Sequence, residues 1–333
     1  MIHQPQIDAR QVFRDVSVFA KPVVARSIFE LAITIIPFIL LWTATWWAVS
    51  NGYWAGWLLT IPAGGLLLRL FVIQHDCGHG SLFRRRATND WVGRALSVLT
   101  LTPYDSWRKS HAKHHATSGN LGKRGIGDID TLTVREYRAR PARQRLWYRL
   151  YRNPFVFFAI GPAFTFILRH RFPMARVSNG WRAWLGTSAT NAAIGTVVAL
   201  VIWNIGIGPF IAIHLPIALI AATAGVWLFY VQHQFEHTVW DDEADWQFHD
   251  AALYGSSYYE LPRVLCWFTG NIGIHHVHHL SSRIPFYRLP EVLRFHPGLA
   301  GVSRLSIRQS IAATRLRLWD QDCRRLLSFS EAS

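Results

Sequence analysis

The sequence predicts an all-α integral membrane protein, with four transmembrane helices in two hairpins and a helical cap on one side of the membrane. Half of the 333 residues are hydrophobic and only 17% are charged. Two long segments, 31–68 and 183–235, contain no Asp, Glu, Lys or Arg. A membrane-spanning helix needs about 20 such residues, so each segment is long enough for two spans.

The first uncharged segment is divided by Asn51-Gly52, a dipeptide typical of turns. It therefore predicts helices over 28–50 and 53–73. Pro37 and Pro62 fall inside these spans, which membrane helices tolerate when neighbouring groups satisfy the freed backbone. The second segment is divided near Gly206–Pro209 and predicts helices over 184–205 and 210–231.

The remaining chain forms the cap, over residues 74–183 and 232–333, and we expect the whole chain, 1–333, to be a single domain. Residues 155–167 are apolar but too short for an ordinary span, and basic residues flank them. We expect this segment to be re-entrant or to lie in the membrane interface.

The charge distribution predicts the orientation of the protein. The formal net charge is +15, yet neither hairpin turn carries a charged residue. Lys and Arg concentrate in cytoplasmic segments of membrane proteins, so the cap is expected in the cytoplasm. This assignment requires Arg69, at the end of the second span, to extend toward the cap. No nucleic-acid-binding motif accompanies the basic residues, so no nucleic-acid partner is expected.

Histidines are the second unusual feature, and eleven of the sixteen lie in four clusters of the cap or at the cap ends of the spans. Within the clusters, spacings of three and four residues place side chains on one helix face, so each group is expected to aim at one point. Eight such imidazoles, with His233 or His237 as a ninth, exceed the coordination of one ion, and two metal ions are predicted. The candidate ligands are His75, His79, His111, His114, His115, His233, His237, His275, His278 and His279.

Other residues near the clusters are not predicted to be metal ligands. Isolated histidines such as His170 and His214 are expected to be structural, and His276 lies off the face of its cluster. The clusters lack the His-Glu-x-x-His pattern of zinc proteases, but imidazole suits iron, zinc and copper alike. Polar residues that could accept hydrogen bonds from the ligands are Asp76, Asn120, Asp128, Asp130, Glu236, Asp241 and Asn271.

Three histidine motifs resemble those of the integral-membrane fatty acid desaturases. They read His75-Asp-Cys-Gly-His79, His111-Ala-Lys-His-His115 and His275-His-Val-His-His279. The surrounding Gly255-Ser-Ser-Tyr-Tyr259 and Thr269-Gly-Asn271 are similar to bacterial acyl-lipid desaturases, including those that act at position 12. The resemblance covers about residues 30–295.

The resemblance implies a diiron enzyme that uses O₂ and two electrons to insert a double bond into a fatty acyl chain of a membrane phospholipid. It assigns two iron ions to the eight motif histidines, with His233 as an additional ligand and His237 as its alternate. It also implies a bacterial inner membrane with the active site on the cytoplasmic face. Because no haem-binding segment like that of cytochrome b5 is found, electrons are expected from a separate donor such as a ferredoxin.

Alternatives remain open from the sequence. A hydroxylase, or an oxygenase that modifies carotenoids or sphingolipids, could use the same iron site. A non-enzymatic metal transporter would need ligands along a path through the bilayer, and only His214 lies deep in a predicted span. The seven arginines of segment 135–152 fit either a helix on anionic lipid or a docking face for an acidic electron carrier.

Overall fold

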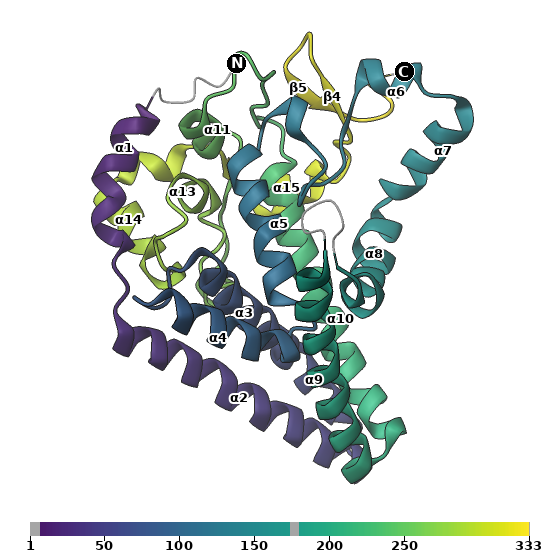
Figure 1. Cartoon of the computed structure of the whole chain (residues 1–333). Helices are drawn as coiled ribbons and strands as arrows, with labels where there is room; N and C mark the ends of the chain where they lie inside the picture. The colour runs from purple at the N-terminus through teal and green to yellow at the C-terminus, as the bar shows by residue number, and fades with distance from the viewer. Residues whose placement is uncertain (1–6, 174–179, 333) are drawn as a thin grey trace.

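Four long helices form the apolar part of the protein, seen in a computed structural model that describes residues 7–173 and 180–332. Those long and apolar enough to cross a bilayer are α2 (Val24–Ser50), η2 (Trp54–Leu59) continued by α3 (Thr60–His79), α9 (Trp181–Ile205) and α10 (Ile207–His233). α2 and α3 form one hairpin, α9 and α10 form the other, and α3 also packs along α10. The far ends of α2, α9 and α10 project away from the other elements (Figure 1). The predicted fold class is confirmed.

The second and fourth of these helices run further into the cap than hydropathy predicts. α3 continues through His79 instead of ending at 73, and α10 continues through His233. Hydropathy falls at Gln74, yet Gln74, His75 and Asp76 are buried within the cap. α3 stops where Gly80 takes a left-handed conformation, with φ of 71°, and its N–H bonds back to the last turn.

Arg69 does not extend toward the cap surface. Its guanidinium is buried against the carboxylate of Glu30 on α2, and it also donates to the Thr34 hydroxyl at 3.2 Å. The guanidinium lies 4.4 Å from the ring centroid of Trp267, which belongs to α12 (Arg263–Phe268). The ion pair joins the two helices of the first hairpin, and the contact with Trp267 joins this hairpin to the cap. An opposite charge therefore neutralises Arg69 without the need to reach water.

The segment expected in the interface packs against α10 and is not one of the four long helices. It consists of α8 (Gly161–Ala163) between two π-helical turns, Val156–Ile160 and Phe164–Leu168. It follows α7 (Ala142–Tyr151), which exposes the large apolar side chains of Leu146 and Trp147. α7 and α8 lie on one flank of the molecule (Figure 1), and the exposed apolar surface of α7 suits the membrane interface.

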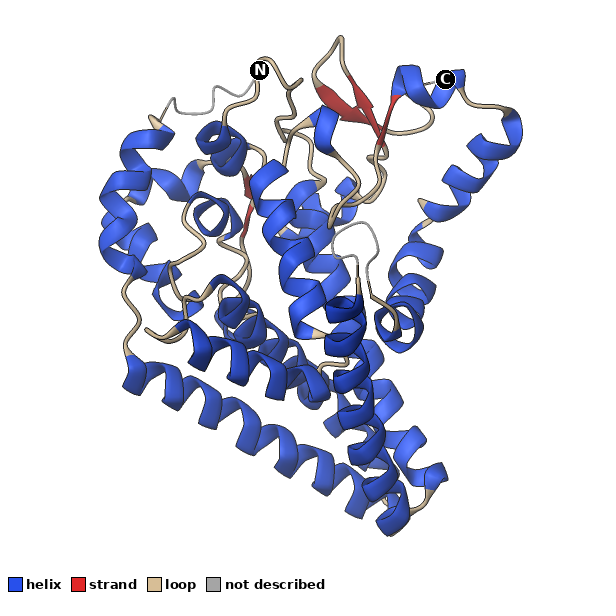
Figure 2. Ribbon diagram, viewed as in Figure 1, coloured by secondary structure: helices blue, strands red, loops and turns tan. Residues whose placement is uncertain are grey.

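The cap is built mainly from short helices (Figure 2). They are α1 (Ala9–Val16), α4 (Arg86–Leu99), α5 (Tyr104–Thr117), α6 (Val134–Ala139), α11 (Phe248–Tyr254), α13 (His275–Leu280), α14 (Leu289–Phe295) and α15 (Ile307–Ala313). The 3₁₀ turns beside them are Ser17–Ala20, Leu121–Lys123, Arg169–Arg171, Phe286–Arg288 and Pro297–Gly301. One cap core lies where α1, α11, α13 and α14 meet.

Within the described residues, the cap also contains five short strands, which the sequence pattern did not predict. β1 (Leu132–Thr133) pairs in parallel with β4 (Leu318–Asp320), and β4 pairs antiparallel with β5 (Arg325–Leu327). β2 (Tyr258–Tyr259) pairs in parallel with β3 (Arg304–Leu305). Strands of two or three residues are too short to show alternating hydrophobicity, which explains why they escaped prediction.

Candidate metal centre

The clustered histidines come from four helices that meet at the base of the cap. His75 and His79 occupy the last two turns of α3, and His233 is the last residue of α10. The other two contributions come from α5 and α13. Since α3 and α10 pack side by side, their final turns bring these three histidines to the same depth.

α13 is only six residues long, and the segment around Ser257 fixes its start. The Ser257 carbonyl accepts hydrogen bonds from the backbone N–H groups of both His275 and His276, each at 3.2 Å. Ser257 also binds the end of α10, because its N–H donates to the Gln232 carbonyl at 3.0 Å. Gly273 lies so close to Tyr259 that a Cβ atom would come within 2.5 Å of the Tyr259 carbonyl oxygen. The Gly-Ser-Ser-Tyr-Tyr motif thus positions two of the histidine-bearing helices.

Nine histidines form two groups, in each of which the nearest ring nitrogens lie within 4.8 Å of one another. The first histidine group contains His75, His79, His111, His115 and His278. The second histidine group contains His114, His233, His275 and His279. The groups adjoin, since the rings of His115 and His279 stack with centroids 4.0 Å apart.

Each histidine triplet divides between the two groups, contrary to the expectation that it aims at one point. On α5, His111 and His115 belong to the first group and His114 to the second. Residues four apart differ by about 40° around a helix, whereas neighbours differ by about 100°. The first and last histidines of a triplet therefore converge, and the middle one points toward the other group. The triplet of α13 is divided in the opposite sense. Its middle histidine, His278, belongs to the first group, whereas His275 and His279 belong to the second.

His237 is not brought to either group. The backbone leaves the helical conformation at Gln234, with φ of −113° and ψ of 80°, so a helical spacing of four from His233 no longer applies. His237 is exposed, whereas His233 is buried within the second group. The structure therefore places His233, and not its predicted alternate, among residues that could hold a metal.

The spacing of the ring nitrogens fits metal coordination. The Nε2 atoms lie 3.0 Å apart for His79 and His111, and 3.1 Å apart for His111 and His115. In the second group, His233 Nε2 lies 3.1 Å from the Nε2 atoms of both His114 and His275. Around an ion with bonds of about 2.1 Å, octahedral neighbours lie roughly 3.0 Å apart and tetrahedral neighbours roughly 3.4 Å apart. The observed spacing matches the octahedral value.

Unsatisfied nitrogens support the same conclusion. Both ring nitrogens of His278, and both of His279, are buried without a hydrogen-bond partner among the described residues. Buried polar atoms normally have a partner, because leaving one unpaired costs about 1–3 kcal/mol. A bound metal ion would satisfy one nitrogen of each ring, so the nine residues fit a pair of ions.

Five histidines of α5 and α13 are suited to metal binding by their protonation state. Burial, followed by the charges that neighbouring histidines would carry, lowers the pKa values of these side chains well below the ordinary value of imidazole. The affected residues are His111, His115, His275, His278 and His279. They are therefore neutral near pH 7, as metal ligands must be.

Two of the seven polar candidates contact clustered histidines. The Nδ1 atom of His114 donates to the carboxylate of Asp128. Asp76 Oδ1 lies 3.3 Å from His75 Nδ1, while its Oδ2 accepts from the Phe286 N–H at 2.7 Å. Such contacts orient the ring and direct its other nitrogen toward a metal.

Among the described residues, the other five candidates form no hydrogen bond with the clustered histidines. Asn120 accepts from the Gly122 N–H and forms a bridge with Asp241, whose carboxylate binds Arg324. Asn271 takes a left-handed conformation in the turn before α13. Asp130 and Glu236 are exposed. His276, considered as a supporting residue, points away to the Leu299 carbonyl at 3.0 Å.

A largely apolar cavity of about 240 Å³ opens against three histidines of the two groups, His75, His111 and His275. Its other walls include Leu68, Phe71, Val72, Trp107, Phe166, His170, Val226, Leu228, Phe229 and Ile272. Sequence reasoning did not identify these residues, although Trp107 carried a signal. It lies one helical turn before His111, and the two rings stack with centroids 4.7 Å apart.

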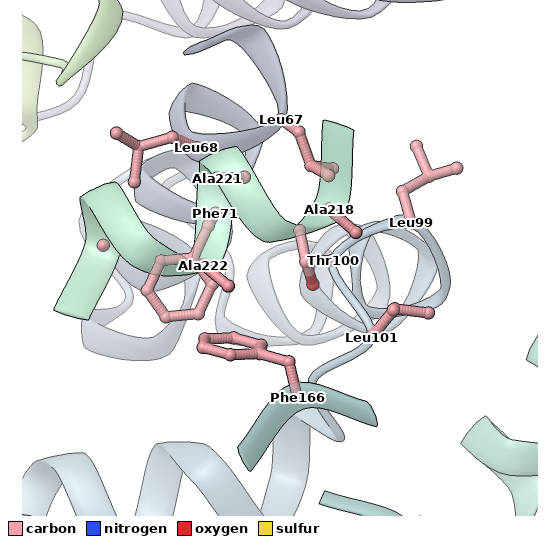
Figure 3. A pocket seen from close by; sticks show the side chains of 11 residues that line it. Leu67, Leu68, Phe71, Leu99, Thr100, Leu101, Phe166, Ala218, Ala221 and Ala222 are labelled. Atoms are coloured by element: carbon pink, nitrogen blue, oxygen red, sulfur yellow. The ribbon is translucent and has the colours of Figure 1, made fainter. Parts of the chain in front are cut away.

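The cavity continues away from the histidines between α3, α4 and α10. A smaller space of about 30 Å³ shares Leu68, Phe71, Phe166 and Gly225 with it. Figure 3 shows this space with the side chains of Leu67, Leu99, Thr100, Leu101, Ala218, Ala221 and Ala222 around it. Beyond Leu99 and Leu101, a third cavity of about 220 Å³ lies among α2, α9 and α10. A line of apolar spaces thus runs from the histidines into the membrane helices.

Together, the four membrane helices and the paired histidine groups define a membrane protein built around a candidate two-metal centre. The family model for fatty acid desaturases matches residues 51–310. The chain therefore belongs to the fatty acid desaturase family, whose members are oxidoreductases.

Three similar proteins support this family assignment. A fatty acid desaturase of Bacillus subtilis is 42% identical over 320 residues, which cover 96% of this chain and 90% of the relative. An sn-1 oleoyl-lipid 12-desaturase of Synechocystis is 30% identical over 70% of this chain and 65% of its own length. A second Synechocystis protein, an sn-1 acyl-lipid omega-3 desaturase (ferredoxin), is 29% identical over 70% of this chain and 64% of its own length.

Proposed function

We propose that the protein introduces a cis double bond into a fatty acyl chain that is linked to a membrane lipid, using O₂ and two iron ions. The observation that carries this proposal is the apolar cavity against His75, His111 and His275, which continues toward the membrane helices. A long hydrocarbon chain fits such a line of apolar spaces, and its middle would then lie beside the histidines.

The nine clustered histidines would hold the two ions, and His237 would not. The neutral imidazoles suit iron, which would supply the activation of O₂ when bound. The protein's own contribution is positioning and exclusion of water. Phe71, Phe166 and Phe229 would hold the chain from its sides, while Asp128 and Asp76 would fix the ring orientations of His114 and His75.

The membrane location of the cavity supports a lipid-linked substrate. Both Synechocystis relatives are named for action on acyl lipids. A lipid-borne chain could reach the cavity from the bilayer without crossing water, whereas a chain esterified to a water-soluble carrier would have to enter from the aqueous side. The cap would lie in the cytoplasm, at the inner membrane of a bacterium, because both hairpin turns lack charge and the cap segments are rich in arginine.

The test is to express the whole chain with a ferredoxin and its reductase in a bacterium that lacks desaturases. Mass spectrometry of the separated lipid classes should show new double bonds in phospholipid acyl chains. Position 12 of an 18-carbon chain is the first position to examine, from the name of the Synechocystis relative. Hydroxylated acids, or modified carotenoids with unchanged fatty acids, would overturn the proposal in favour of another oxygenase reaction.

A further inference from the structure

A basic cleft opens in the cap directly beyond the end of α10. Its volume is about 850 Å³, and its walls come from α15, β5 and the residues that follow His233. Four arginines line it: Arg304, Arg315, Arg317 and Arg325.

The acidic residues that line the cleft only partly offset these arginines. They are Glu236 and Glu331, and Glu331 accepts hydrogen bonds from the N–H and hydroxyl groups of Ser328. Arg304 is paired with Glu260 at 2.7 Å. Arg315 and Arg325 are exposed and form no ion pair within 4.0 Å among the described residues, although Arg325 lies near enough to Glu331 to help lower the pKa of that carboxyl. The cleft therefore presents unneutralised positive charge to a partner.

The floor of the cleft is connected to the second histidine group in two ways. Phe235 lines the cleft and follows His233 by two residues, a backbone distance of at most about 7 Å. Leu316 and Leu326, also on the floor, pack on the stacked rings of Trp240 and Trp319, whose centroids lie 5.3 Å apart.

Trp240 completes the second connection. It shares the lining of a space of about 30 Å³ with His114 and His233. The Trp319–Trp240 pair thus lies between the floor of the cleft and a space that this histidine group lines. Trp319 is 1% exposed, so the pair is shielded from water along its length.

We propose that this cleft docks the electron donor of the reaction, an acidic one-electron carrier of the ferredoxin class, and that the Trp319–Trp240 pair lies on the electron path. The inference rests on the proposed function, and the ferredoxin in the name of one relative is in keeping with it. Anionic lipid is a poor occupant, because β4 and β5 lie at the opposite end of the molecule from the far ends of α2, α9 and α10 (Figure 1).

The other basic segment, which contains α7, is better suited to a lipid surface. α7 carries exposed Leu146 and Trp147 among its arginines, which suits a lipid surface better than a polar protein surface.

Docking at the cleft also satisfies the electron balance. Each carrier is oxidised by one electron, so two dockings supply two electrons. With two protons, these reduce one O₂ to two waters while a –CH₂–CH₂– unit becomes –CH=CH–.

Binding is tested with a purified oxidised plant-type [2Fe–2S] ferredoxin and the whole chain in nanodiscs of neutral lipid, without added metal. The double variant Arg315→Glu and Arg325→Glu should weaken binding at least about tenfold at low salt, and the difference should shrink as salt rises. Arg143→Glu with Arg283→Glu makes the same charge change at exposed positions outside the cleft and should leave binding unchanged. Equal binding by both double variants would overturn the docking site.

The path is tested separately, by the rate at which the metal-loaded protein oxidises reduced ferredoxin under saturating conditions. Trp319→Leu should slow this rate by about tenfold or more with an unchanged dissociation constant, whereas Trp319→Phe, which keeps an aromatic ring, should stay near the original rate. An unchanged rate in Trp319→Leu would overturn the path. Absence of ferredoxin binding to the unmodified chain would overturn the docking proposal, while lipid products would still report independently on the proposed function.

Discussion

Replacing Asp128 with Ala should selectively weaken metal binding by the second histidine group. The carboxylate accepts a hydrogen bond from His114 Nδ1, and the opposite nitrogen of that ring faces His233 at 3.1 Å. A hydrogen bond to a charged group contributes about 1.5–3 kcal/mol, which corresponds to roughly a 10- to 150-fold change in affinity. Loss of supporting groups at metal sites typically costs 10- to 100-fold, so the two estimates agree.

The assay is metal content per chain after equilibration with increasing chelator, measured by plasma mass spectrometry. The unmodified protein should retain two ions to higher chelator concentration than Asp128→Ala, which should lose one ion first. Asp130→Ala is the matched control, because this nearby carboxylate is exposed and forms no hydrogen bond with a clustered histidine in the described part of the chain. Retention of both ions by Asp128→Ala at every chelator concentration would refute the reasoning.

Three further predictions follow from specific contacts. Arg69→Met should lower the free energy of unfolding by about 1–3 kcal/mol, because the buried Glu30 would keep only the half-exposed Arg26 as its ionic partner, and adding Glu30→Gln should recover much of the loss in denaturant titrations in detergent. Gly93→Ala should cost about 1–3 kcal/mol in the same titration, since its Cβ would lie 2.2 Å from the Tyr104 ring; unaltered stability would contradict this packing. His237→Ala should retain both ions in the chelator assay, and loss of one ion would indicate that His237 is a metal ligand.

The membrane helices were predictable because hydropathy and charge report directly on burial in lipid. The ends of these helices that lie in the cap were harder to predict. α3 passes through Gln74, His75 and Asp76, which look like the start of a polar loop but are buried by the cap that folds over them. Arg69 was misplaced for a related reason, because its partner Glu30 lies on another helix and nothing in the sequence shows that they meet.

The histidine clusters were evident from spacing, but their division was not. The sequence shows that His111, His114 and His115 share one side of a helix, and only the arrangement of α5 against α3, α10 and α13 decides which ring faces which group. The cavity and the Trp240–Trp319 pair were beyond prediction, because their residues come from distant segments that the fold brings together. Local patterns report on one element at a time.

The unpartnered nitrogens of His278 and His279 have a consequence for how the protein matures in the cell. Without ions, the short α13 holds buried polar atoms that water would satisfy better, so this part of the cap should open readily in the metal-free chain. Metal binding removes that penalty and ties the ends of α3, α5 and α10 to α13, which lies far along the chain. Membrane insertion can therefore precede completion of the cap, and the supply of metal ions would set how much of the inserted protein becomes resistant to proteolysis.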